Sequence, residues 1–214
     1  EGDGTNPILT FGTSAQIRVQ NDATLNLLSN DTVDFGNAPQ FRIGADSAAG
    51  PGTLNTNGFN IGDTPLQLIL GNPQAGRSGI VTGSGTITGR NFDLYEGSIA
   101  AGLVTSTGND NLDKMGPGTV TLSGDNTGLT STGRTRIIQG NLILDYTSDT
   151  NQKISNANSS ELEMRGGTLT LNGHASTAVI EDIGVTGTGN DQLRLNDGDG
   201  YNVVTLNNNG GDIG

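Results

Sequence analysis

The chain has 214 residues, of which 35 are glycine, 31% are hydrophobic and 4% are aromatic, and it contains no Cys and no Trp. The lack of Cys excludes disulfide bonds, thiolate nucleophiles and thiolate metal sites. A formal net charge of -12 with only 10 Lys plus Arg excludes a basic stripe that would bind nucleic acid or an anionic membrane surface.

This composition also differs from that of a disordered chain. Low hydrophobicity with net charge is typical of disorder, but charged residues are only 15% here and short alternating apolar runs recur throughout. We therefore predict one ordered domain over 1–214, built from thin layers. No apolar stretch approaches the roughly 20 residues of a membrane helix, so we expect no membrane insertion by this chain.

Strand-like runs follow one another along the chain, separated by Gly, Asn, Asp or Pro. In most of them apolar and polar residues alternate, which places one face inward and the other in water. The runs are 17–19, 24–27, 33–35, 41–43, 59–61, 66–70 and 92–94. The best helical candidate is 155–164, and its end at 162–164 is itself strand-like. The sequence therefore predicts an all-β protein.

A phrase recurs through the chain: glycine, a polar residue, an aliphatic residue, a polar or aliphatic residue, and often a further aliphatic residue. It begins at Gly52, Gly85, Gly118, Gly140 and Gly167, with spacings of 33, 33, 22 and 27 residues. Recurrence at 20 to 50 residues is typical of a solenoid. In a parallel β-helix each strand pairs with the coils above and below, so only a narrow column of side chains needs burial. An antiparallel β-sandwich is the alternative, but its hairpins do not predict this recurrence.

The phrase also predicts which side chains point inward. In 119–122 the two aliphatic residues share one face and the threonines share the other. The predicted core positions are Val120, Leu122, Ile137, Leu142, Leu144, Leu169 and Leu171. Gly and Asn tolerate the positive φ angles of sharp corners, and stacked amides hydrogen-bond from coil to coil. The predicted turn positions are Gly118, Gly124, Asn126, Gly140 and Gly167.

One longer string resembles a known repeat. Residues 112–127, LDKMGPGTVTLSGDNT, are continued by GRTRIIQGNLIL at 133–144. Together they resemble the autotransporter-associated β-strand repeat. The resemblance implies a right-handed parallel β-helix in a bacterial protein that is secreted or displayed on the cell surface, often as an autotransporter passenger. The family's N-T-Y-T-G is replaced by Asn126-Thr127-Gly128-Leu129-Thr130 here, which predicts a different coil corner.

Candidate chemical groups are few. His174 is the only histidine, and we interpret it as a turn residue, because one His without Cys does not make a zinc site. The stretch 187–193 resembles one unit of the calcium-binding nonapeptide of repeats-in-toxin proteins. Calcium there is shared between tandem turns, and the next stretch loses the pattern. Weak calcium ligands are therefore conceivable only at Asp191, Asp197 and Asp199, and no cofactor is otherwise expected.

The only compact group of acidic and basic residues on a strand is Glu161, Glu163 and Arg165. Parallel β-helices also carry polysaccharide lyases and hydrolases, which need clustered carboxylates with Arg or Lys on one face. An exposed charge ladder is the interpretation we favour, because exposed strands ordinarily carry such charges.

These observations favour an extracellular structural protein over an enzyme. We expect roughly nine coils of about 22 to 25 residues. Because neither end reads as a capping helix, we also expect stacking of copies end to end as a filament subunit, or continuation into a longer stalk. An adhesin for glycans or a host surface is the alternative, although it would need an exposed aromatic groove. A polysaccharide lyase or hydrolase is the third candidate function.

Overall fold

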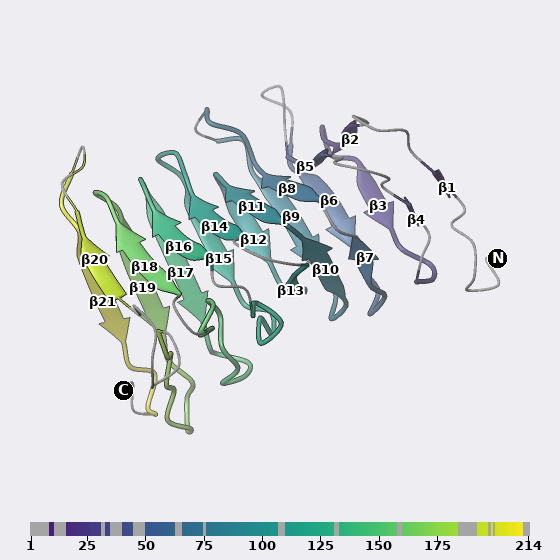
Figure 1. The fold of residues 1–214 in the computed structure, drawn as a ribbon. Helices are drawn as coiled ribbons and strands as arrows, with labels where there is room; N and C mark the ends of the chain where they lie inside the picture. The colour runs from purple at the N-terminus through teal and green to yellow at the C-terminus, as the bar shows by residue number, and fades with distance from the viewer. Residues whose placement is uncertain are drawn as a thin grey trace.

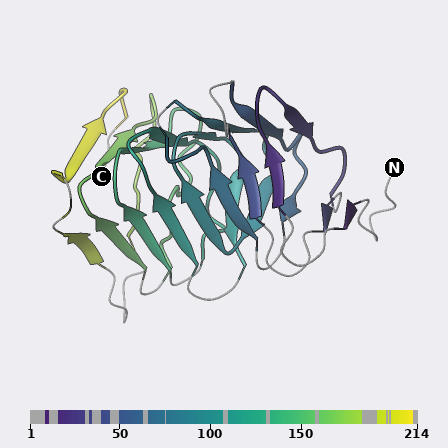
Figure 2. The same cartoon turned by 90° about the horizontal axis from the view of Figure 1, so that it is seen from above.

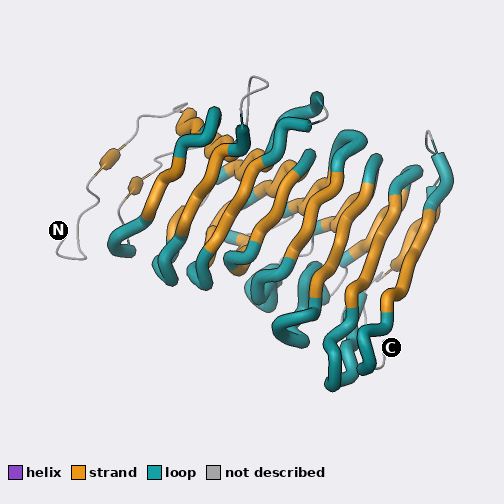
Figure 3. The backbone as a smooth tube through the Cα atoms, turned by 180° about the vertical axis from the view of Figure 1, so that it is seen from behind, coloured by secondary structure: helices purple, strands orange, loops and turns teal. Residues whose placement is uncertain are grey.

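The computed structural model describes residues 9–10, 16–30, 33–34, 40–44, 50–62, 66–74, 76–106, 110–130, 133–157, 160–183, 192–196, 198 and 200–211. Every regular element within these residues is a strand (Figure 3). The helical candidate at 155–164 is wrong, because 161–164 form a strand and the other described residues of that range are irregular. Within the described parts of the chain, no helix is long and apolar enough to cross a membrane.

The strands lie on three faces. Face one is an eight-stranded sheet of β2 (Gln16–Val19), β5 (Gln40–Ile43), β8 (Gln67–Leu70), β11 (Asn91–Leu94), β14 (Asn111–Lys114), β16 (Arg134–Ile137), β18 (Glu161–Met164) and β20 (Gln192–Leu195). Face two is an eight-stranded sheet of β3 (Thr24–Asn26), β6 (Gly52–Asn55), β9 (Gly79–Thr82), β12 (Gly97–Ile99), β15 (Thr119–Leu122), β17 (Asn141–Asp145), β19 (Thr168–Asn172) and β21 (Val203–Asn207). Face three holds β7 (Ile61–Gly62), β10 (Thr86–Gly89) and β13 (Gly102–Thr105), with β1 (Leu9–Thr10) and β4 (Val33–Asp34) as a separate pair.

Successive strands of each face come from successive turns of the chain and pair in parallel (Figure 1). Every pairing among the described strands is parallel, so the fold is a parallel β-solenoid and the antiparallel sandwich is wrong. Faces one and two each show eight stacked strands, compared with about nine expected coils. The two sheets face each other across the interior along the whole stack (Figure 2).

The core consists of vertical columns of inward side chains. On face two, one column runs from Leu25 through Leu54, Val81, Ile99, Leu122, Leu144 and Leu171 to Leu206. On face one, a matching column runs from Ile17 through Phe41, Leu68, Phe92, Leu112, Thr135 and Leu162 to Leu193. Because each coil contributes only a few apolar residues, a chain that is 31% hydrophobic still fills its interior.

One of the five recurring phrases lies on a different face. The phrases at 52, 118, 140 and 167 begin strands of face two, whereas the phrase at Gly85 begins β10 on face three. On face two, Gly79 and Gly97 occupy the register position of Gly52 on the next two coils. The phrase therefore marks the start of a strand after a corner, and it does not specify which face that strand joins.

Coil length changes along the stack. Asn91 and Asn111 occupy the same register position 20 residues apart, whereas Glu161 and Gln192 do so 31 residues apart. Face three has no described strand beyond β13, and longer loops follow the later strands of face two instead.

Candidate assembly interface

The last coil exposes residues that belong to the core columns. Leu193 and Leu195 on β20 are 51% and 61% exposed, and Val204 and Leu206 on β21 are 50% and 57% exposed. Their register partners one coil earlier, Leu162, Met164, Leu169 and Leu171, are all buried. A further coil covers the buried set, whereas no described strand stacks on β20 or β21. We call the four exposed residues, with the strands that carry them, the open end.

The backbone at the open end is equally unpartnered. Strands β20 and β21 are terminal in their sheets, so one edge of each has no strand beside it among the described residues (Figure 1). Tyr201, which lies two residues before β21, is exposed as well. Free strand edges beside exposed apolar side chains are a template for pairing with another strand.

The first coil differs from the last. Strands β2 and β3 are also terminal in their sheets, but Val19 and Leu27 are buried, and Ile17 and Leu25 are partly buried against the core. The two ends of the stack are therefore not equivalent, and the open end has the larger unsatisfied apolar surface.

The structure places the predicted core residues together in the stack. Val120, Leu122, Ile137, Leu142, Leu144, Leu169 and Leu171 are all buried in one hydrophobic cluster. Gly118, Gly140 and Gly167 directly precede face-two strands, where the carbonyl oxygen of each accepts a hydrogen bond from the next coil. Gly140 has a φ of 75°, in the region that favours glycine. Gly124 follows β15 at a corner.

Asn126 connects three coils. Its Oδ1 accepts a hydrogen bond from the backbone N–H of Leu103 at 2.8 Å, on the preceding coil. Its Nδ2 donates to the carbonyl oxygen of Lys153 at 2.9 Å, on the following coil. Its side chain is buried, so both bonds are shielded from water, and the corner amide joins coils as the sequence suggested.

Lys114 has a role that the sequence did not reveal. It lies in an inward column of face one, between Leu94 and Ile137, and is fully buried. Its Nζ donates to the carbonyl oxygens of Met115, Gly116 and Gln139 at 2.9, 2.8 and 2.9 Å. Burial lowers the pKa of Lys114 to about 8, and the nearby Glu96 carboxylate opposes that shift. The Lys114 side chain therefore connects the corners of two successive coils through hydrogen bonds.

Polar side chains form ladders on the outer surface of face one. Gln16 donates to Gln40 at 2.8 Å, Gln40 donates to Gln67 at 2.9 Å, and Gln67 donates to Asp93. Asp113, the register neighbour of Asp93, accepts both hydrogen bonds of a bidentate pair with Arg136. Burial raises the pKa of Asp93. The hydrogen bond from Gln67 opposes this increase, and the nearby Asp113 carboxylate adds to it.

The group at Glu161, Glu163 and Arg165 differs from an exposed ladder. Both glutamates lie on the outer side of face one, but Glu163 is only 1% exposed. Arg165 bends back to Glu163 at 2.9 Å, while Arg134 pairs with Glu161 at 2.9 Å. Burial alone would raise the pKa of Glu163, but Arg165 and other neighbours outweigh it and lower the pKa. The Glu163 carboxylate is therefore held in its ion pair as an anion and is not poised as a general acid.

The other sequence candidates are His174 and three aspartates. His174 follows β19, and its Nδ1 accepts hydrogen bonds from the backbone of Ser176 and Thr177 at 3.2 Å, as expected of a turn residue. Asp191, Asp197 and Asp199 lie outside the described residues. Within the residues that are described, no three His, Asp or Glu side chains are placed to hold a metal ion.

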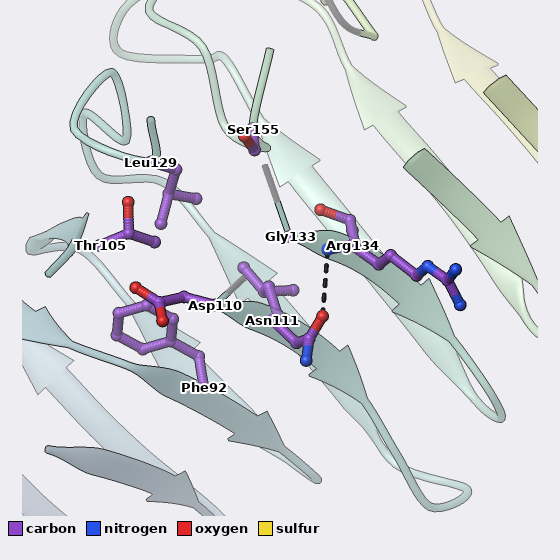
Figure 4. A pocket seen from close by; sticks show the side chains of 10 residues that line it. Phe92, Thr105, Asp110, Asn111, Leu129, Gly133, Arg134 and Ser155 are labelled. Atoms are coloured by element: carbon purple, nitrogen blue, oxygen red, sulfur yellow. Dashed lines mark hydrogen bonds between the residues drawn. The ribbon is translucent and has the colours of Figure 1, made fainter. Parts of the chain in front are cut away.

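Two concave features lie on the described part of the chain. The first, beside Phe92, Leu129 and Arg134, has a volume of about 10 Å³, room for about one water molecule (Figure 4). The second is an open groove of about 450 Å³ lined by small, hydroxyl and acidic side chains: Ser84, Thr86, Ser123, Asp125, Thr127 and Asp149. Among the described residues that line the groove, none is aromatic, so it does not offer the stacking surface expected of a glycan-binding adhesin.

A buried polar cluster fixes the loops beside the last coils. Glu181 accepts hydrogen bonds from the Tyr146 hydroxyl and, at 3.0 Å, from the backbone N–H groups of Lys153 and Ile154. The Lys153 Nζ is buried, pairs with Asp149 at 2.6 Å and lies 5.3 Å from the Tyr146 ring centroid. We call Tyr146, Lys153 and Glu181 the loop clasp. Burial raises the pKa of Glu181 to about 7, against the opposing effect of its hydrogen bonds.

The loop clasp predicts a pH-dependent stability. Because the folded protein binds the Glu181 proton more tightly than the unfolded chain, which titrates near the ordinary value of 4.5, stability falls as pH rises from about 4.5 to 7. Because Glu181 keeps some contact with solvent, which weakens the effect, we expect a loss of roughly 1 to 3 kcal/mol. Urea unfolding across this range measures it. Glu181→Gln should remove most of the slope; an unchanged slope in that variant would assign it to other groups.

Comparisons with protein-family models, curated proteins and solved structures give no match for this chain. The resemblance of 112–144 to the autotransporter-associated repeat accordingly stays a prediction.

Proposed function

We propose that this chain is an extracellular structural protein, a rigid β-solenoid segment of a bacterial surface stalk or filament that extends by stacking a further coil on its open end. The open end is the observation that carries the proposal. Four apolar residues at core register positions, together with two free strand edges, match what each interior coil offers to the next coil. A stacked coil would bury them as the interior coils bury theirs.

Other features support a structural role over catalysis. Charged side chains on face one pair with one another along the stack, which stiffens the surface without leaving clustered acid and base groups. Amide ladders and buried corner residues add hydrogen bonds from coil to coil. Extracellular location and export as a passenger rest on the resemblance at 112–144. The proposal includes no enzymatic activity and no cofactor.

Association should respond to the open end specifically. Replacing Val204 and Leu206 with lysine places two charges where the next coil would stack, so we expect the double variant to stay a single domain. Sedimentation velocity and negative-stain microscopy at rising protein concentration should show rods for the parent protein and single domains for the variant.

A matched control distinguishes an effect of where the two lysines are placed from an effect of the added charge itself. Thr119→Lys with Thr121→Lys adds the same two charges on the outer side of β15, in the middle of the stack, where both threonines point away from the core. This variant should form rods like the parent. If the parent protein stays a single domain at every concentration, or if both double variants behave alike, the proposal is wrong.

A further inference from the structure

The two ends of the stack carry matching residues at matching register positions. On face two, the first strand presents Leu25 inward and Asn26 outward, and the last strand presents Leu206 inward and Asn207 outward. On face one, Ile17 begins the column that Leu193 ends. A second copy translated along the stack axis would therefore continue each column with a residue of the same kind.

Asparagine side chains form a hydrogen bond between neighbouring coils at each end of face two, and both bonds run in the same direction. Asn55 Nδ2 donates to Asn26 Oδ1 at 3.1 Å, and Asn207 Nδ2 donates to Asn172 Oδ1 at 2.8 Å. In both pairs the later coil donates to the earlier one. Among the described residues, no hydrogen bond uses Asn26 Nδ2 or Asn207 Oδ1, which are the donor and the acceptor that this direction requires across a joint. Stacked amides of this kind stabilise parallel, in-register strands.

Symmetry favours the same arrangement. Translation along the axis brings face one onto face one and face two onto face two, so both sheets continue with parallel pairing. A two-fold axis perpendicular to the stack would instead pair the terminal strands of the two copies antiparallel, unlike every pairing among the described strands. Head-to-tail contacts of the translational kind do not close, and they generate filaments.

We propose that the occupant of the open end is a second copy of this chain, whose β2 and β3 pair in parallel with β20 and β21. Asn26 of that copy lies against Asn207, Leu25 against Leu206, and Ile17 against Leu193. Leu195 ends the register column that Val19 begins, so it lies against Val19 of that copy. These contacts form the apolar part of the joint. The inference rests on the proposed function and specifies its partner and register.

The joint has one unfavourable contact that gives a measurable signature. Arg194 would lie beside Arg18 of the next copy, so two positive charges would meet across the joint. A similar arginine pair, Arg18 and Arg42, already occupies neighbouring register positions within the chain. Each copy also carries a formal net charge of -12. Salt screens both repulsions, so we expect the association constant to rise several-fold between low and physiological ionic strength.

Cysteine cross-linking tests the register, because the chain has no cysteine of its own. In the variant Asn26→Cys with Asn207→Cys, the two thiols of neighbouring copies would sit on adjacent strands about 4.8 Å apart, within disulfide range. Both positions are exposed, so folding is not at risk. Within one chain they are seven strand steps apart, roughly 34 Å, which prevents intramolecular closure. Mild oxidation should give a ladder of multimers on a non-reducing gel.

Two controls identify the other outcomes. Thr24→Cys with Asn207→Cys shifts the pair by two residues, about 7 Å along the strand, and should cross-link at least tenfold more slowly. Asn207→Cys alone should give little covalent dimer. If rods form but the shifted pair reacts as fast, or Asn207→Cys alone gives mainly dimers, the head-to-tail register is wrong while the proposed function stands. If the parent forms no rods and no variant cross-links, the proposed function fails as well.

Discussion

Gly97→Val should lower the free energy of unfolding by about 3 to 5 kcal/mol, the largest loss that we expect from a single substitution in this chain. Gly97 has a φ of 134°, and a Cβ built on it would lie 1.8 Å from the carbonyl oxygen of Gly79 on the neighbouring coil. The substitution therefore combines backbone strain of about 1 to 3 kcal/mol with overpacking of similar size. The obstacle is backbone, so no side-chain rearrangement relieves it.

A control at Gly76 separates these two costs. Gly76 also has a positive φ, 80°, but a Cβ there would meet nothing within 4 Å. Gly76→Val should therefore show only the backbone cost. Thermal unfolding followed by circular dichroism should place the Gly97 variant about 10 °C below the parent and the Gly76 variant much closer to it. Equal losses in the two variants would mean that the coils are not in the close contact described at Gly79.

Lys114→Met should cost about 2 to 3 kcal/mol even though it replaces a buried charge with an apolar side chain of similar length. Without the Nζ, three backbone carbonyl oxygens lose their donor. Hydrogen bonds from charged groups contribute about 1.5 to 3 kcal/mol each, and relief from burying the ammonium offsets part of that loss. Arg90→Met, at an exposed position, should stay within about 0.5 kcal/mol.

The pH dependence of the Lys114 effect has a defined sign. Its folded pKa, about 8, lies below the ordinary 10.5, so the unfolded chain binds more protons between these values. The parent protein should therefore gain stability relative to Lys114→Met as pH rises from about 8 to 10.5. Guanidinium unfolding of both proteins at several pH values measures the difference. A gap that narrows over this range would contradict the buried, depressed lysine.

The sequence predicted the stacked parallel strands because the relevant signals are local. Alternation in Thr119–Leu122 specifies which side chains point inward, since a slip by one residue would expose Val120 and Leu122. The recurrence of the phrase indicates that such strands come from successive coils. Neither signal specifies which face the strand after a corner joins. The position of the Gly85 phrase on face three was therefore not predictable from the sequence.

Long-range contacts were the part that sequence reasoning missed. Alternation places Lys114 on the same side as Leu112, but nothing local shows that three carbonyl oxygens from two coils converge there. The Glu163–Asn196 and Tyr146–Glu181 contacts likewise join residues that are 33 and 35 positions apart along the chain. The sequence predicted uncapped ends, but only the structure shows that the last coil exposes its core columns more than the first.

A cryo-electron microscopy map of the assembled parent protein tests the central claim most directly. The account predicts rods of constant width in which strands spaced about 4.8 Å apart run across the junction between copies without a break, with β21 of one copy beside β3 of the next. Particles that remain single at all concentrations, or rods whose copies meet along their sides, would contradict it.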